Sequence, residues 1–104
     1  MNIYNVTFIV ESEIEKDWAE YLDREVLPDL GKNVHQIDLL KVTFEEGTNN
    51  VKGTTFTVQF YCIDNEMIKW VKEIGHQILL QKLHRKFTKH WVAFASKLEF
   101  IKSY

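Results

Sequence analysis

Apolar and polar residues alternate along three stretches of the chain, and each alternation predicts a β-strand. The stretches are residues 2–10, 55–62 and 90–103. The side of each strand that we expect to face a core carries Tyr4, Val6, Phe8 and Val10, then Phe56, Val58, Phe60 and Cys62, then Val92, Phe94, Leu98 and Phe100. Strands with one apolar side are typical of a sheet that is packed on one face and open on the other.

Residues 34–46 form a further predicted strand with a less regular pattern. Leu40, Val42 and Phe44 are in phase, whereas Ile37 and Leu39 have the opposite parity. This phase change indicates either a bulge near Leu39 or a strand that is covered on both faces. Turn-forming residues follow at positions 46–50, so this strand and the next should form an antiparallel hairpin.

A helix is predicted between the first two strands. Ser12 and Glu15 have the spacing of a capping box, which places the helix start near Ser12. Apolar residues then recur every four positions, so one side of the helix should face the core. These residues are Ile14, Trp18, Leu22 and Val26. Pro28 and Gly31 are expected to end the helix.

A second helix is predicted to begin after Asp64, which is a suitable N-cap residue. Its apolar positions do not form one continuous stripe. Met67, Val71, Ile74 and Ile78 share one side, and Leu80, Leu83 and Phe87 fall nearly opposite Val71 at 100° per residue. The pattern therefore predicts either a bend near Gly75 or a helix with two buried faces.

The predicted order is β-α-β-β-α-β. Two right-handed crossovers around a central hairpin give a ferredoxin-like α+β sandwich, in which a four-stranded antiparallel sheet carries both helices on one face. The opposite face is expected to hold apolar residues among polar ones, and a second copy of the chain is the simplest cover for it. The residues that predict this homodimer interface are Ile3, Ile9, Tyr61, Trp91, Ala93 and Ala95.

Several short segments resemble a bacterial family that is known as domain of unknown function 4286. They are Ile3-Tyr4-Asn5-Val6-Thr7, Trp18, Leu27-Pro28, Leu39-Leu40-Lys41-Val42, Lys86-Phe87-Thr88, Val92-Ala93-Phe94 and Leu98-Glu99. The resemblance covers nearly the whole chain and implies a structural lineage rather than an activity. This chain has Thr88-Lys89 and Ala95-Ser96 where the family typically has glycine-aspartate and arginine-threonine, so no anion-binding role is carried over. The architecture also resembles the dimeric α/β-barrel proteins, which include small monooxygenases and haem-degrading enzymes.

The composition fits one globular domain spanning residues 1–104. Of these 104 residues, 45% are hydrophobic and 27% are charged, which excludes disordered and collagen-like chains. The single cysteine, Cys62, excludes an intrachain disulfide. No apolar stretch reaches the ~20 residues of a membrane-spanning helix, and no signal-peptide pattern is present. We therefore expect a cytoplasmic protein with no membrane partner.

Basic residues gather at the end of the second predicted helix. Lys82, Arg85, Lys86 and Lys89, with Trp91 nearby, have the composition of a nucleic-acid patch. However, the isoelectric point of about 6.1 argues against a nucleic-acid partner. Cations are also favoured at a helix C-terminus by the helix dipole, which accounts for these residues without a ligand.

The sequence predicts no metal site and no cofactor. No pair among His35, His76, His84 and His90 has the three- or four-residue helical spacing of two metal ligands. Haem-degrading barrel proteins use an asparagine on the first strand with a tryptophan and a histidine on the second helix, and Asn5, Trp70 and His76 match these residue types. The six residues from Trp70 to His76 turn an α-helix by ~600°, which places the two side chains on different faces unless the helix bends at Gly75. We therefore predict no specific haem binding.

The residues expected between sheet and helices are large enough to fill that space. They are Tyr4, Trp18, Tyr21, Phe44, Phe60, Phe94 and Phe100. A filled core leaves no cavity for a substrate, so the sequence favours a non-enzymatic structural or interaction module that forms a homodimer. The alternative that stays open is a small-ligand-binding protein or a haem-dependent monooxygenase of the dimeric α/β-barrel type.

Overall fold

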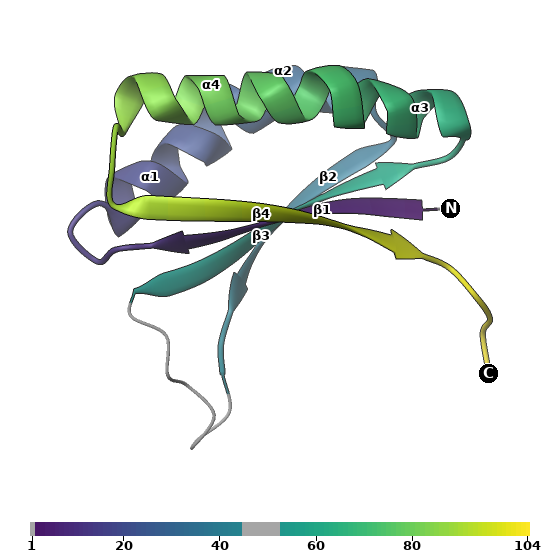
Figure 1. Ribbon diagram of the computed structural model, residues 1–104, viewed down its shortest axis with the longest axis horizontal. Coiled ribbons are helices and arrows are strands. Elements are labelled where there is room, and N and C mark those ends of the chain that lie inside the picture. The colour runs from purple at the N-terminus through teal and green to yellow at the C-terminus, as the bar shows by residue number, and fades with distance from the viewer. Residues whose placement is uncertain (1, 45–52) are drawn as a thin grey trace.

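In the computed structural model, which describes residues 2–44 and 53–104, four strands form one antiparallel sheet (Figure 1). The strands are β1 (Asn2–Val10), β2 (Gln36–Val42), β3 (Thr54–Cys62) and β4 (Trp91–Glu99). Their order across the sheet is β2-β3-β1-β4. The predicted ferredoxin-like α+β fold is confirmed.

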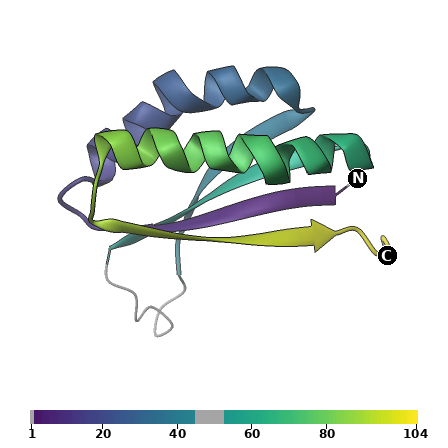
Figure 2. The same cartoon turned by 45° about the horizontal axis from the view of Figure 1, so that its top comes forward.

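Two helical segments lie side by side on one face of this sheet (Figures 1 and 2). The first consists of α1 (Glu15–Tyr21), the π-helical turn η1 (Leu22–Val26), α2 (Leu27–Leu30) and the 3₁₀ turn η2 (Gly31–Asn33). The second consists of α3 (Asn65–Trp70), the π-helical turn η3 (Val71–Gly75) and α4 (His76–Lys86). The other face of the sheet carries no helix among the described residues.

The two π-helical turns explain how an apolar residue at every fourth position stays on one side. Four residues turn an α-helix by 400°, so such a stripe drifts by about 40° at each step. A π-helical turn holds more residues and cancels part of this drift. The buried positions are Trp18, Leu22, Val26 and Leu30 in the first segment and Val71, Gly75, Leu79 and Leu83 in the second.

In the second helix this geometry corrects two sequence-based placements. Ile74 was expected to face the core but is 45% exposed. Leu83 was expected on the opposite side from Val71, but both are fully buried. The expected bend near Gly75 is a π-helical turn, in which a Cβ atom at Gly75 would lie 2.8 Å from Cζ3 of Trp70.

The helix ends follow the prediction at one place and depart from it at two. Asp64 caps α3, since its Oδ1 accepts a hydrogen bond of 2.8 Å from the backbone N–H of Met67. The capping box at Ser12 is wrong, because α1 begins at Glu15 without a side-chain cap. The Glu15 carboxylate instead accepts a hydrogen bond from the Thr54 hydroxyl. Pro28 does not end the helix, because the chain stays helical through α2 and the 3₁₀ turn η2 to Asn33.

Strand β2 is shorter than the predicted range of 34–46 and contains no bulge. Its register with β3 is continuous from Gln36 to Val42. Ile37 and Leu39 lie opposite the buried Phe60 and Val58 and pack against the core. Phe44, which was expected in the core, lies beyond the strand and is exposed. The predicted turn at residues 46–50 falls outside the described residues.

The face assignment of β4 is reversed relative to the prediction. In the register of β1 and β4, Trp91 and Ala93 lie opposite the buried Val10 and Phe8. The alternate residues Val92, Phe94 and Leu98 therefore point to the open face. β4 is an edge strand, and its inner side meets the core through Trp91 and Ala93.

Candidate functional site

The open face of the sheet carries a row of exposed apolar side chains along β4 and the segment after it. Val92 is 58% exposed, Phe94 58%, Leu98 44% and Phe100 66%. For comparison, solvated sheet faces are mostly polar. Several exposed apolar side chains in one row indicate an interaction surface, which we call the open-face strip.

Two neighbouring strands extend the open-face strip. Ile9 lies opposite Val92, and Ile3 lies between Leu98 and Tyr61. A hollow of about 270 Å³ is lined by Ile3, Tyr61, Leu98, Glu99 and Phe100. The C-terminal residues leave the sheet beyond this end of β4 (Figure 1).

Charged residues do not occur among the twelve open-face positions of β1, β3 and β4. These positions, which the strand registers define, are Ile3, Asn5, Thr7, Ile9, Thr55, Thr57, Gln59, Tyr61, Val92, Phe94, Ser96 and Leu98. A face without lysine or arginine is a poor surface for nucleic acid, whose binding depends on neutralising phosphates. Its apolar and uncharged polar residues suit another protein surface.

Asn5 lies near the centre of this face and is only 7% exposed. Its Nδ2 donates hydrogen bonds to Oγ1 of Thr7 at 3.0 Å and to Oγ of Ser96 at 3.5 Å. Its Oδ1 is buried and has no hydrogen-bond partner among the described residues. An unpaired buried carbonyl costs about 1–3 kcal/mol. The single chain therefore leaves a hydrogen-bond acceptor unpaired at the centre of the face.

Three of the six residues predicted for a dimer interface lie on the other side of the sheet. Trp91 and Ala93 pack against the core beneath the helices. Ala95 lies opposite the buried Val6, so it points to the same side. The remaining three, Ile3, Ile9 and Tyr61, do lie on the open face. The sequence missed Val92, Phe94 and Leu98, because alternation alone does not show which parity of an edge strand the helices cover.

The residues considered for haem, namely Asn5, Trp70 and His76, do not converge. His76 lies on the helix side, where its Nδ1 is 2.9 Å from the hydroxyl of Tyr4. Asn5 follows Tyr4 in β1, so its side chain points to the opposite face of the sheet. The Trp70 ring packs over Gly75 instead of facing a shared cleft.

Among the described residues, Tyr4 and His76 form a partly buried, hydrogen-bonded pair of titratable side chains between the sheet and the helices. Burial lowers the pKa of the His76 imidazole and raises the pKa of the Tyr4 phenol. Both groups are therefore held in their neutral forms, with the phenol able to donate to Nδ1. Cys62 offers no nucleophile, because burial raises the pKa of its thiol and its sulfur lies 3.6 Å from the carbonyl of Phe60.

Two of the basic residues at the end of α4 face acidic residues of the first helical segment. Nζ of Lys82 is 3.9 Å from Asp29, and Nζ of Lys86 is 3.9 Å from Glu25. The indole N–H of Trp91 donates to the carbonyl of Phe87 at 2.7 Å, so Trp91 is not a free stacking platform. This cluster therefore links the two helices.

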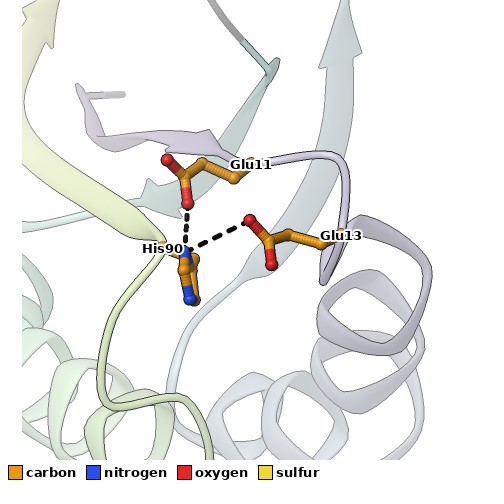
Figure 3. A group of neighbouring side chains, drawn as sticks. All are labelled: Glu11, Glu13 and His90. Atoms are coloured by element: carbon orange, nitrogen blue, oxygen red, sulfur yellow. Dashed lines mark hydrogen bonds and ion pairs between the residues drawn. The ribbon is translucent and has the colours of Figure 1, made fainter.

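The structure brings together one further group of chemically capable side chains, Glu11, Glu13 and His90 (Figure 3). Nδ1 of His90 contacts the carboxylate of Glu11 and lies 3.5 Å from Oε1 of Glu13. Sequence spacing did not show this cluster, because the glutamates and the histidine lie at opposite ends of the chain. The signal that could have found it is the position of Glu11 just after β1 and of His90 just before the neighbouring β4.

A further hollow, of about 550 Å³, lies between the end of the first helical segment and β2. It is lined by Leu27, Pro28, Gly31, Ile37, Leu39 and Leu40, with Asp23 and Asp38 as its charged groups. This lining contains no histidine, cysteine or hydroxyl group. It therefore lacks the paired nucleophile and base of a covalent active site.

The model of one protein family, described as a domain of unknown function (DUF4286), matches residues 1–101. The chain belongs to the DUF4286 family. No curated protein matches the sequence. Among the described residues, no helix is long and apolar enough to cross a membrane.

Solved structures place this DUF4286 chain among ferredoxin-like folds. An ethyl tert-butyl ether D (EthD) family protein from Bacillus halodurans C-125 has a TM-score of 0.59 at 12% identity, over 92% of this chain and 97% of that chain. The de novo designed protein Foldit4 has a TM-score of 0.55 at 10% identity, over 96% of this chain and 97% of that one. At these identities the likeness concerns the fold alone, and a designed protein with this architecture underlines that the fold does not specify a function.

Proposed function

We propose that this protein is a non-enzymatic interaction module that works as a homodimer, with the open-face strip as its interface. The observation that carries the proposal is the row of Val92, Phe94, Leu98 and Phe100, which are 44–66% exposed on a face to which β1, β3 and β4 contribute no charged residue. Burying such side chains contributes about 25 cal/mol for each Å² of apolar surface removed from water.

A second copy is the partner that this face fits best. In a two-fold dimer the same patch lies on both subunits, so it must be complementary to itself. The open-face positions of β1, β3 and β4 meet this requirement, since they carry no charged residue, and Asp38 on the edge strand β2 is the charged residue that the register places on this face. The open sheet face also allows the apolar side chains of two copies to interdigitate, as they do between packed sheets.

Asn5 supports the same arrangement. Its amide offers both a donor and an acceptor, so two copies can satisfy one another's amides once the neighbouring side chains rearrange. A single polar group in an apolar interface can fix the relative register of two subunits. We therefore assign Asn5 a role in orienting the dimer.

The cytoplasmic location is part of the same proposal. It rests on the single cysteine, Cys62, which is buried and free, as expected in a reducing compartment. Cell fractionation that recovered the protein from an oxidising compartment would contradict it.

Sedimentation equilibrium of the wild-type protein and of Phe94→Glu tests the proposed dimer. The wild type is expected to sediment as a dimer at micromolar concentrations and Phe94→Glu as a monomer, because the substitution places a charge in the apolar interface. Ile74→Glu is the matched control, since Ile74 is 45% exposed but lies on the second helix. This control should stay dimeric. A monomeric wild type, or a Phe94→Glu variant that stays dimeric, would refute the interface.

A further inference from the structure

We propose that Glu11, Glu13 and His90 form a binding site for a divalent transition-metal ion of the zinc class. One ligand atom from each residue lies within 4.8 Å of the other two. The three ligands lie outside the open-face strip, although the hollow beside them shares Ile9 and Val92 with it.

The sheet holds two of the three ligands in place. Val10 and Trp91 form the terminal residue pair at this end of the β1–β4 register. The backbone N–H of Glu11 donates to the carbonyl of His90 at 2.9 Å, which continues this pairing by one residue. Neighbouring side chains on paired strands are about 5 Å apart, so strand pairing by itself brings the Glu11 carboxylate and the His90 imidazole together.

Glu13 and the backbone of His90 complete the arrangement. Glu13 lies in the turn between β1 and α1, and its carboxylate points back toward the imidazole (Figure 3). His90 has a φ of 76°, a left-handed conformation that histidine tolerates better than most residues. The segment after β1 and the residue before β4 thus direct three donor groups to one point.

The donor set selects the class of ion. One imidazole nitrogen and two carboxylates are a ligand set that Zn²⁺ accepts in tetrahedral geometry, with water in the fourth position. Mg²⁺ and Ca²⁺ prefer sites composed of oxygen atoms alone. A divalent ion brings two positive charges, which neutralise the two carboxylates.

The surroundings allow an ion to enter and to keep a water ligand. The side chain of His90 is 32% exposed, and those of Glu11 and Glu13 are more exposed. A hollow of about 320 Å³, lined by Ile9, Glu11, His90, Trp91 and Val92, lies beside the ligands. The site is therefore open to solvent, and two of its ligands are held by the end of the sheet.

Isothermal titration of Zn²⁺ into the chelator-treated full-length protein tests this inference. We expect saturable binding of one ion per chain. His90→Gln and Glu13→Gln should each weaken it by at least about tenfold, because even changes outside the ligand set weaken metal affinity by about 10–100-fold. Glu13 is well exposed, so Glu13→Gln provides a variant that folds even if His90→Gln does not.

The matched control is His35→Gln, which removes an exposed histidine far from the cluster. Its Zn²⁺ affinity should equal that of the wild type. Binding should also persist in Phe94→Glu, which separates this result from the dimer. An absence of saturable binding, or an affinity that Glu13→Gln and His35→Gln change equally, would show adventitious adsorption only and would overturn the proposal.

Discussion

The Tyr4 hydroxyl and Nδ1 of His76 are 2.9 Å apart and join the first strand to the second helix. They are 72 residues apart in the sequence. Because Tyr4 is almost fully buried, this contact lies at the margin of the core, where burial favours neutral groups. The pair therefore couples the packing of the helix on the sheet to the protonation of one histidine.

Lowering the pH should destabilise the protein through His76. Its folded pKa lies below the ordinary value of 6.5, so below that value the unfolded chain binds a proton more readily than the folded chain. Its contribution is fully present above about pH 6.5 and is lost as the pH falls toward the folded pKa. Urea unfolding at about pH 7.5 and about pH 5.5 measures the loss, and His76→Gln should show a smaller one. An equal loss in the variant would assign the effect to other groups.

Asp64→Ala should lower the free energy of unfolding by about 1 kcal/mol, because it removes the N-cap of α3. Ser12→Ala should change it by less than about 0.5 kcal/mol, since α1 has no side-chain cap. Chemical denaturation of the two variants makes the comparison. A larger loss for Ser12→Ala than for Asp64→Ala would restore the capping box that the sequence suggested.

The two helical glycines should respond oppositely to alanine. Gly31→Ala should stabilise the protein by about 0.4–1 kcal/mol, because Gly31 has helical φ and ψ and a Cβ atom there meets no neighbour within 4 Å. Gly75→Ala should destabilise it by about 1–3 kcal/mol, because the Cβ atom would press on the Trp70 ring. Thermal unfolding of Gly75→Ala in a Trp70→Leu background gives the decisive control, since the penalty should vanish there.

Ala93→Glu and Phe94→Glu should have different consequences although the residues are adjacent. Ala93 packs against the core, so a glutamate there should lower the free energy of unfolding by roughly 1–3 kcal/mol. Phe94 is 58% exposed on the open face, so Phe94→Glu should leave the unfolding of the single chain nearly unchanged. Urea unfolding at a low protein concentration separates the two effects. Equal destabilisation by both would contradict the observed face assignment of β4.

The chain's alternation and its helical spacing determined the order of elements and the fold. Phe8, Val58 and Phe60 are fully buried as their parity predicts, because both helices cover the central strands β1 and β3. The polar N-cap of Asp64 was equally readable, since capping depends on residues close in sequence. Local periodicity and local capping were thus sufficient to predict these elements.

Tertiary structure alone decided the face of β4 and the membership of each site. Ala93 and Phe94 fit either face by alternation, and only pairing with Phe8 and Thr7 fixes which of them meets the helices. Likewise, Glu11 and His90 became neighbours only through the β1–β4 register. Sequence patterns report local periodicity. A site that joins residues almost eighty positions apart depends instead on which strands pair and in which register.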